Sequence, residues 1–440
     1  MKPRHRLCPA LLLFASLAGV GAGAQTLSES VTGIFGDVLG IRLSGPGAHG
    51  NHFLPSNVST SQAVISSLGN LIATSASQYP LSSSSVGLTF DLSSGVPIAT
   101  RTSAGPIFGE RAQTLGKGRL NAGMNYSMLD LEKIRGLNTD EIQFVFLHQN
   151  IGDLSVYGDD PNEHDYIVLD ANLDLDATVI AFYGTYGISD RFDVGIAVPY
   201  VSVSLSAEPF ARMNSYTYTA NGSANHYFDG TSVNPTLTLN GSTVDETSSG
   251  IGDVTIRAKW HAYRGERYDL GFLVQATLAT GDEENFLGQG DPSYKLNMIA
   301  STTAGNFSPY ANLGYHIRTS DLARDRIGLA LGYDQRLSDR FTLALEWNGE
   351  FETGDQVKEL EFPSSVEIMG PVGPTPSRVS QSVQPTNIPA FEKDNITNAS
   401  FGIKWTPSAK FLGYANIILP TNDGGLRSNS ITTLGVELNF

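Results

Sequence analysis

Hydrophobic and polar residues alternate with a period of two along most of the chain after residue 118. The segment 253–262 is an example, with Val254, Ile256, Ala258, Trp260 and Ala262 on one face and Asp253, Thr255, Arg257, Lys259 and His261 on the other. Successive side chains of a β-strand point to opposite faces, so this alternation predicts strands with one apolar and one charged face.

Twelve such strands are predicted. They cover residues 118–131, 164–187, 192–206, 251–264, 268–281, 292–304, 307–318, 325–337, 340–354, 395–406, 409–421 and 427–440. Bacterial single-chain barrels have an even number of strands, and most of these segments exceed the ~9–11 residues that cross a bilayer. Two weaker segments, 86–93 and 143–149, would raise the number to fourteen. Within 192–206 the apolar parity changes at Pro199, which predicts a β-bulge.

The connections between these strands alternate in length. The short ones are 189–191, 265–266, 304–307, 338–340 and 406–409, and the other set, mostly longer, is 132–163, 207–250, 282–291, 319–324, 355–394 and 422–426. Short periplasmic turns and long external loops are typical of outer-membrane barrels. The sequence therefore predicts an all-β fold, a transmembrane antiparallel outer-membrane β-barrel of about 12 strands over 118–440.

The C-terminus ends in an aromatic residue. The pattern Thr433-x-Gly435-x-x-Leu438-x-Phe440 resembles the C-terminal assembly signal of Gram-negative outer-membrane barrels. It implies Gly435, Leu438 and Phe440 as recognition residues, the barrel assembly machinery and outer-membrane lipids as partners, and the outer membrane of a Gram-negative bacterium as the location.

Residues 1–24 have the features of a secretory signal peptide. Lys2, Arg4 and Arg6 precede an apolar run over 7–20, and Ala22-Gly23-Ala24 forms the cleavage site. Removing its three cations takes the formal charge from −16 to −19. The chain's one cysteine, Cys8, also leaves, so the mature chain has no disulfide and no cysteine metal site.

Residues 25–117 form a segment rich in Gly, Ser, Thr and Pro, with one amphipathic helix predicted at about 59–75. Ahead of the first strand lie Phe108, Glu110 and Arg111. Two interpretations stay open: a plug folded into the lumen, or a flexible periplasmic lead. We favour the plug, because its apolar residues need burial and barrel lumens can be filled by loops or a helix.

Charged residues make up only 16% of the chain, against about 25% in soluble domains. A lipid-facing half on every strand explains this depletion. The net charge of −16 excludes a nucleic-acid binder with a broad basic surface. The many aromatic residues are unlike the composition of disordered chains.

The face opposite the apolar one should line the lumen. The predicted lumen residues are Arg119, Asp170, Asn172, Asp174, Asp176, Asp253, Arg257, Lys259, Glu346 and Glu350. The aspartates of 164–187 would form a ladder of like charges that needs cations nearby. It is either a polar track or ion site, or an ordinary set of salt bridges that holds the plug, and the second is favoured. The acidic segments 159–163 and 282–284 are interpreted as solvated loops, with no metal and no cofactor.

The second half of the chain resembles an outer-membrane transporter family described as "Putative MetA-pathway of phenol degradation". The resemblance covers about 250–440 and is carried by Gly252-Asp253-Val254, by Leu278-Ala279-Thr280-Gly281-Asp282 with Gly288-Gln289-Gly290, and by Asn312-Leu313-Gly314-Tyr315. The family typically has proline in place of Ala279. It implies a barrel that takes up small hydrophobic or aromatic molecules. The layout is similar to that of fatty-acid and aromatic hydrocarbon transporter barrels, in which an N-terminal hatch precedes the strands.

The predicted function is an outer-membrane channel or transporter for passive uptake of small hydrophobic or aromatic molecules, with such a ligand as a partner. The alternative is a structural or surface-binding barrel that uses the loops 207–250 and 355–394. The chain is not predicted to be an enzyme, because it contains neither G-x-S-x-G nor His-Glu-x-x-His.

Overall fold

The computed structural model of the 440-residue chain describes residues 25–31, 33, 90–91, 98–99, 103–148, 163–320, 323–354, 366–370, 379–384 and 386–440. The predicted signal peptide at 1–24, the predicted helix at 59–75 and most of the acidic segment 159–163 lie outside these residues. Among the helices that are described, none is long and apolar enough to cross a membrane.

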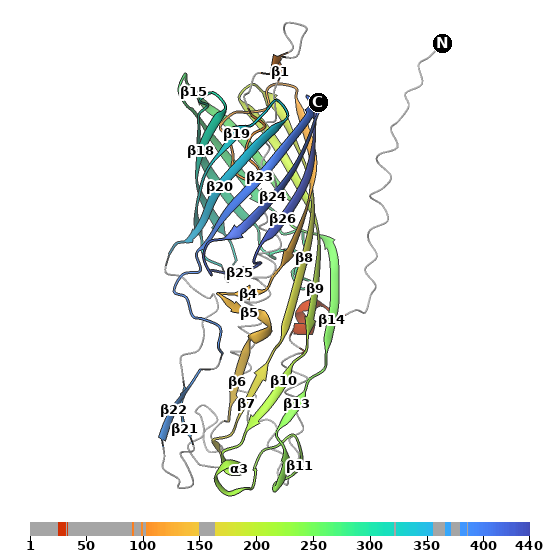
Figure 1. Ribbon diagram of the computed structural model, residues 1–440, viewed down its shortest axis with the longest axis vertical. Coiled ribbons are helices and arrows are strands. Elements are labelled where there is room, and N and C mark those ends of the chain that lie inside the picture. Colours follow the sequence, from red (N-terminus) through yellow and green to blue (C-terminus); the bar gives the residue numbers. More distant parts are fainter. Residues whose placement is uncertain are drawn as a thin grey trace, which may run out of the picture.

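Twelve antiparallel strands close into a barrel (Figure 1). They are β3 (Leu120–Asp130), β8 (Leu173–Ser189), β9 (Phe192–Ala207), β15 (Thr255–Arg264), β16 (Asp269–Thr277), β17 (Ser293–Ser301), β18 (Phe307–Arg318), β19 (Arg326–Arg336), β20 (Phe341–Glu352), β23 (Ile396–Ser408), β24 (Phe411–Pro420) and β26 (Ile431–Asn439). Each strand pairs with the next in this order, and the last strand, β26, pairs with the first, β3, which closes the ring. The predicted all-β barrel of twelve strands is confirmed.

The described residues of the two further segments that would have made fourteen strands do not join the ring. β1 (Phe90–Asp91) pairs with β2 (Ile98–Ala99). β6 (Gln143–Leu147) belongs to a separate four-stranded sheet with β7 (Tyr166–Asp170), β10 (Phe210–Asn214) and β13 (Thr238–Asn240).

The outer surface of the barrel is apolar. Exposed large side chains on it include Ile196, Trp260, Val274, Leu313, Phe401 and Leu434. Aromatic pairs lie near the short turns, such as Trp260 with Phe272 and Phe307 with Tyr333, and another, Trp347 with Phe351, lies near the opposite end of β20. An apolar band between aromatic girdles is the surface that a lipid bilayer requires. The protein is therefore an outer-membrane barrel.

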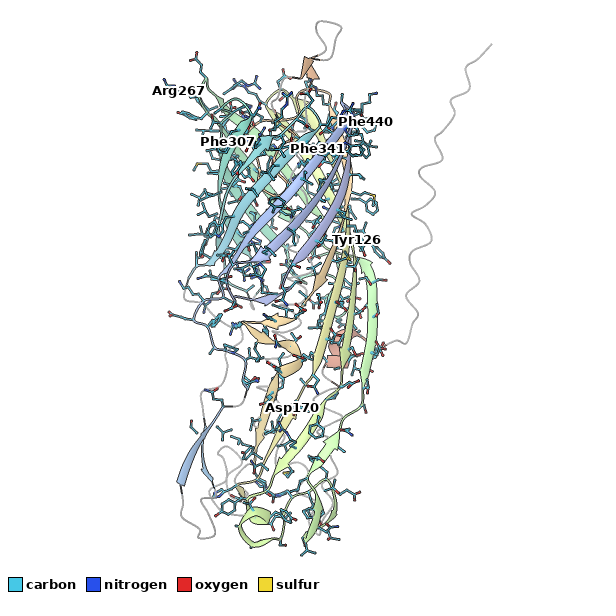
Figure 2. All side chains as sticks on the ribbon, viewed as in Figure 1. Tyr126, Asp170, Arg267, Phe307, Phe341 and Phe440 are labelled. Atoms are coloured by element: carbon cyan, nitrogen blue, oxygen red, sulfur yellow. The ribbon has the colours of Figure 1, made fainter. Side chains whose placement is uncertain are left out.

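The predicted alternation of short and long connections is confirmed. Short turns join β8 to β9, β15 to β16, β17 to β18, β19 to β20 and β23 to β24 at the end that also holds the C-terminus (Figure 1). Figure 2 shows Arg267, Phe307, Phe341 and Phe440 at this end. Because short turns are periplasmic in such barrels, we call it the periplasmic end and its opposite the external end.

A long extension continues from the external end (Figure 1). β8 and β9 project into it, and β14 (Val244–Ile251) pairs with the projecting part of β9, from Tyr200 to Ala207. The four-stranded sheet lies beside them. The smaller elements are β4 (Lys133–Ile134), β5 (Leu137–Asn138), η2 (Thr139–Glu141), α3 (Tyr216–Asn221), β11 (Asp229–Thr231), β12 (Asn234–Thr236), β21 (Val366–Gly370), β22 (Val379–Val383) and β25 (Leu426–Arg427).

The prediction of one strand over 164–187 is wrong. The segment contains β7 and β8, which are separated by a corner at Asn172, where φ is 47°. The Asn172 side chain donates to the Glu208 carbonyl oxygen at 2.7 Å. Asparagine tolerates this left-handed conformation better than most residues. The corner places β7 in the four-stranded sheet and leaves β8 in the barrel.

The polarity of β8 inverts along its length while its inward and outward positions stay the same. Within the barrel Phe182 faces outward and Thr185 is buried inward, whereas in the extension Asp176 faces outward and Leu175 is buried inward. The outward face of β8 contacts lipid within the membrane and water in the extension. Its inward face lines the polar lumen within the membrane and packs into a hydrophobic core in the extension. The change between Asp176 and Phe182 marks the external membrane boundary.

The same inversion explains the parity change at Pro199 in β9. The predicted bulge is wrong, because β8 and β9 pair without interruption through Ala181 and Pro199. Pro199 lies between the part of β9 that pairs with β15, which ends at Ala197, and the part that pairs with β14, which begins at Tyr200. A residue without an N–H group is tolerated at such a gap.

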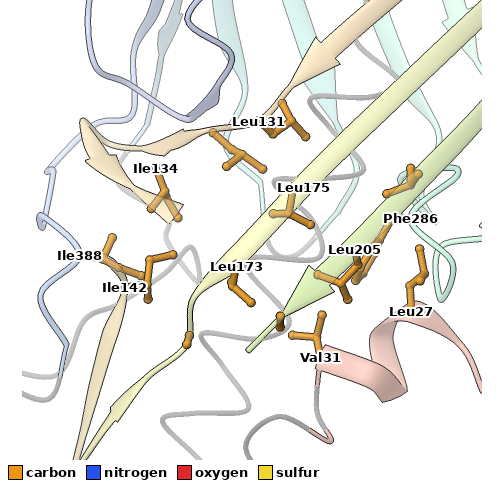
Figure 3. Packing of buried hydrophobic residues seen from close by; sticks show 14 of the residues in the cluster. Leu27, Val31, Leu131, Ile134, Ile142, Leu173, Leu175, Leu205, Phe286 and Ile388 are labelled. Atoms are coloured by element: carbon orange, nitrogen blue, oxygen red, sulfur yellow. The ribbon is translucent and has the colours of Figure 1, made fainter. Parts of the chain in front are cut away.

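A large hydrophobic cluster fills the extension where it meets the barrel (Figure 3). It includes Leu131, Ile134 and Ile142 from the β3–β6 region, Leu173, Leu175 and Leu205 from β8 and β9, Phe286, Ile388, and Leu27 and Val31 from the helical residues 27–31. Leu27 N–H donates to Asn285 and Ser28 N–H to the Glu284 carbonyl oxygen, so these N-terminal residues lie at the external rim.

Candidate functional site: the barrel lumen

Residues 103–117 lie inside the periplasmic half of the barrel. Hydrogen bonds join this segment to inward-facing residues of β9, β15, β16, β17, β18, β19, β20 and β23. The segment ends at the periplasmic rim, where Lys117 N–H donates to Asp190 Oδ1 at 3.1 Å and the following residue, Gly118, donates its N–H to the Gly187 carbonyl oxygen at 2.8 Å. We call residues 103–117 the lumen segment.

Two sets of buried ion pairs hold the lumen segment. Arg111 pairs with Asp334 of β19, and Ser103 bonds both of these residues. Glu110 accepts from Arg257 at 3.2 Å and from Lys259 at 3.0 Å, both on β15. A charge buried without its partner costs several kcal/mol, so these pairs fix the position of the segment.

Hydrogen bonds to the backbone of the segment add to this anchoring. Glu110 N–H donates to Asn312 Oδ1 at 2.7 Å, and Asn312 Nδ2 donates back to the Glu110 carbonyl oxygen at 2.8 Å. Lys404 Nζ, which is fully buried, donates to the Pro106 carbonyl oxygen. The backbone of the segment is thus paired by lumen side chains in the absence of strand neighbours, as buried backbone requires.

Gly109 lies close against the barrel wall. Its N–H donates to Glu346, whose carboxylate also accepts from the Tyr310 hydroxyl at 2.7 Å. A Cβ at Gly109 would lie 2.2 Å from the Tyr310 ring and 2.4 Å from Glu346 Oε2. Only glycine therefore fits at this position.

A chamber of about 330 Å³ opens on the external side of the lumen segment. Phe108, Gly109 and Glu110 contribute to its lining from the segment. Its charged and polar lining comes mainly from Arg257, Gln275, Lys295, Asn297, His316, Glu346, Asn348, Glu350 and Arg427, and its apolar lining from Leu129, Leu131, Leu273, Leu329, Ile396, Ile418, Leu426 and Ile431. The chamber therefore offers a ligand both an apolar and a charged surface.

The charged lining is held by a network of ion pairs. Glu350 accepts from Lys295 at 2.9 Å and from Arg326 at 3.4 Å, and Arg326 also pairs with Glu352 at 3.2 Å. Arg427 lies at the external mouth of the chamber, where burial lowers its pKa to about 10 and Asp394 opposes that shift. Its guanidinium is charged at neutral pH.

The structure brings four of the predicted lumen residues together. Arg257 and Glu346 contact the lumen segment and line the chamber, Lys259 contacts the segment beneath it, and Glu350 lines the charged wall. Arg119 lies half-buried at the periplasmic end, just before β3. Phe108, Glu110 and Arg111 of the predicted plug all lie within the lumen segment.

Five predicted lumen residues lie elsewhere, and one of them, Asn172, forms the corner between β7 and β8. Asp174 and Asp176 are exposed on the outer face of β8 in the extension, and Asp170 on β7 pairs with Arg212 at 3.0 Å (Figure 2). The expected ladder fails because the segment bends at Asn172 and leaves the membrane. Asp253 is buried at the external rim, where it accepts backbone N–H groups from Thr280, Gly281 and Gln289.

The C-terminal pattern closes the ring. Phe440 and Leu120 exchange backbone hydrogen bonds at 2.8 and 3.1 Å, and the side chains of Leu438 and Phe440 face outward and are exposed. Gly435 faces the Tyr414 ring, which a Cβ would approach to 2.2 Å. Gly435 therefore provides the room for a tyrosine inside the barrel, while its role as an assembly signal stays a prediction.

Sequence reasoning missed several lumen residues. They are Lys295, Tyr310, Asn312, Arg326, Asp334 and Lys404. All of them lie at inward-facing positions of strands that the alternation predicted. Their place in the alternation could therefore have identified them as lumen residues. The residues of the lumen segment that contact them follow no sequence pattern, so these contacts could not be predicted. In the described part of the chain, no group of three or more His, Cys, Asp or Glu residues is arranged to hold a metal.

A family model described as "Putative MetA-pathway of phenol degradation" matches residues 158–367. The chain resembles this phenol-degradation family, as the motifs predicted. The match begins earlier and ends earlier than the expected range of about 250–440, and it extends from before β7 to beyond β20. No curated protein sequence matches the chain.

Solved structures show remote likeness to the chain. An outer membrane channel from Pseudomonas putida F1 has 11% identity, covers 76% of this chain and 99% of its own, and has a TM-score of 0.40. The P. putida toluene transporter TodX has 10% identity, coverages of 77% and 97%, and a TM-score of 0.33. The CymD monoaromatic hydrocarbon channel has 8% identity, coverages of 74% and 88%, and a TM-score of 0.30. TM-scores this low indicate only a remote likeness. The fold is established by the closed hydrogen-bonded ring of strands.

Proposed function

We propose that the protein is a gated outer-membrane channel for passive uptake of small molecules with an apolar or aromatic body, and not an enzyme. The observation that carries this proposal is the chamber inside the closed ring, open on the external side of the lumen segment. An eight-stranded barrel is filled by its own side chains, whereas sixteen-stranded porins are open. A twelve-stranded lumen leaves intermediate room.

We further propose that the lumen segment is the gate. It is one continuous piece of chain that forms the floor of the chamber and reaches the periplasmic rim. Its displacement would join the chamber to the periplasm without any change in the strands. Phe108 and the apolar lining support an aromatic ligand, as does the family's description. Membrane lipids and the barrel assembly machinery are the expected partners.

Single-channel conductance in planar bilayers tests this function. The full-length mature chain should give rare openings, and a chain that lacks residues 25–110 should conduct steadily, because the deletion removes Phe108, Gly109 and Glu110 from the lumen. The second chain must show the same heat-modifiable migration as the first, which reports a closed barrel. A correctly folded deletion chain that stays silent would contradict the channel.

The second candidate function is a surface-binding barrel, which the size of the external extension favours. The extension has its own hydrophobic cluster and sheet, a larger structure than the passage of small molecules demands. If cells without the protein take up small aromatic compounds at the normal rate, while the deletion chain is silent in bilayers, this second function replaces the first.

A further inference from the structure

The Glu110 carboxylate occupies a site made by two cations of the barrel wall. Arg257 Nη1 donates to Glu110 Oε1 at 3.2 Å, and Lys259 Nζ donates to Glu110 Oε2 at 3.0 Å. Both cations lie on β15, on the same inward face, and Arg257 also contacts Thr185 at 3.2 Å. The wall thus fixes two positive charges that receive one carboxylate, with one oxygen for each.

This carboxylate belongs to the movable part of the proposed channel. Glu110 comes from the lumen segment, whereas Arg257 and Lys259 belong to the barrel sheet. If the segment leaves, the two cations lose their partner in a largely buried place, and such a place favours a replacement anion. Glu110 therefore stands where a ligand carboxylate would bind.

The surroundings of the site suit a small ligand with an apolar body. Arg257, Glu110 and Phe108 all line the chamber, and the same chamber is lined by Leu129, Leu131 and other apolar side chains. Its volume of about 330 Å³ is at the lower end for ligand sites, which favours a single ring or a short chain.

A second carboxylate limits the charge of the ligand. Glu346 lines the same chamber next to Gly109, and its partners are Tyr310, Asn348 and the Gly109 N–H, with no ion pair among the described residues. A ligand with two negative charges would meet its repulsion. The chamber therefore favours a single carboxylate.

We propose that Arg257 and Lys259 form the binding site for the carboxylate of a small aromatic monocarboxylic acid, and that Glu110 occupies this site while the channel is closed. The proposal rests on the channel function and narrows its substrate class from apolar molecules in general to apolar monoanions. A ligand that reaches the site through the external chamber replaces Glu110 and releases the lumen segment.

Equilibrium dialysis of the full-length mature protein in detergent tests the site with radiolabelled benzoate, with toluene as the neutral probe and benzylammonium as the cationic probe. Glu110→Gln should bind benzoate about 10-fold more tightly, because it removes the competing carboxylate. Arg257→Gln should bind it about 10-fold or more weakly, since a charge-assisted hydrogen bond contributes about 1.5–3 kcal/mol and 1.4 kcal/mol is tenfold. Toluene binding should change in neither variant.

Two further variants make the test specific. Arg264→Gln removes an exposed arginine from the periplasmic end of the same strand and should leave benzoate binding unchanged. Arg257→Lys keeps the charge and should restore part of the binding that Arg257→Gln loses, which a mere folding defect would not do. Equal benzoate binding in the wild type, Glu110→Gln and Arg257→Gln would overturn the proposal, as would a preference for benzylammonium.

Failure of this site and failure of the channel are distinguishable. If the chain lacking residues 25–110 conducts but benzoate binding is unchanged in Arg257→Gln and Glu110→Gln, the channel function is supported and the carboxylate site is contradicted. If that chain does not conduct but benzoate binding changes as expected in both variants, the carboxylate site is supported and the channel function is contradicted.

Discussion

The contact between Arg111 and Asp334 is a buried ion pair that attaches the lumen segment to β19. Asp334 is fully buried and Arg111 nearly so. Arg111→Gln leaves the Asp334 carboxylate without its cation, at a cost of about 3–5 kcal/mol for breaking a buried pair. We expect faster proteolysis of the segment in the folded barrel and more frequent channel openings.

The matched control for Arg111 is Arg336→Gln. Arg336 pairs with Asp339 in an exposed turn, where an ion pair contributes at most about 1 kcal/mol. Proteolysis and conductance should match the wild type. Identical proteolysis rates in Arg111→Gln and Arg336→Gln would show that the ion pair does not hold the segment.

Asp253 fixes a loop at the external mouth of the barrel. Its carboxylate accepts three backbone hydrogen bonds, from Thr280 at 3.2 Å, Gly281 at 2.9 Å and Gln289 at 2.8 Å. Burial raises the pKa of Asp253, and these hydrogen bonds oppose the rise. Asp253→Ala should speed amide hydrogen exchange at all three positions, because bonds to a charged group contribute about 1.5–3 kcal/mol each.

Asp282→Ala in the same loop is the comparison. The Asp282 side chain accepts from the Glu284 N–H and from Asn285, so its loss should leave exchange at Gln289 unchanged. If both substitutions accelerate exchange at Gln289 equally, the loop lacks the single anchor that the Asp253 contacts indicate.

At the element scale, β8 carries its own marker of the membrane boundary. Phe182 and Asp176 both face outward on this strand, Phe182 in the barrel and Asp176 in the extension. Phe182→Arg should destabilise the barrel by about 2–4 kcal/mol, the cost of a lipid-facing cation near the bilayer midplane. Asp176→Arg should change stability by at most about 0.5 kcal/mol, as for most surface substitutions.

Urea unfolding of the protein in lipid vesicles measures both effects. If the membrane boundary lies between Asp176 and Phe182, the two variants must differ in stability. Equal loss of stability in both would place Asp176 in the bilayer, and no loss in either would place Phe182 outside it.

The strands show which parts of the fold were predictable. Alternation located all twelve barrel strands, because the lipid and the lumen impose opposite polarity on successive residues. It failed where the environment changes along one strand: the inversion in β8 turned Asp174 and Asp176 into apparent lumen residues, and the inversion in β9 produced an apparent bulge at Pro199. The corner at Asn172 depends on a side-chain bond to Glu208 that no periodicity reveals.

The candidate site was predictable in part for a similar reason. Arg257, Lys259, Glu346 and Glu350 follow from parity alone. That Glu110 meets Arg257, and that Arg111 meets Asp334, depends on how an irregular segment lies within the lumen, with 146 and 222 residues between the partners in sequence. Contacts between residues so far apart cannot be predicted from the local sequence pattern.

The whole molecule consists of a closed barrel and a separate lumen segment, which we propose is movable. The ring of twelve strands is closed by backbone bonds, whereas the lumen segment is attached by side chains alone over most of its length. A conformational change confined to the segment would therefore leave the membrane-spanning part intact. The extension would remain at the external end as a fixed entrance.

A reversible disulfide tests this separation most directly. Ser301 Oγ accepts from the Ala112 N–H at 3.1 Å, so cysteines at these two positions would tether the segment to β17, and the mature chain predicted from the sequence contains no other cysteine. The pair Ala112→Cys and Ser301→Cys is introduced into the Arg111→Gln chain, with Ser301→Cys alone as the control. We predict that single-channel conductance disappears on oxidation and returns on reduction in the double-cysteine chain only. Conductance that persists unchanged in the oxidised chain would contradict the claim that this segment closes the channel.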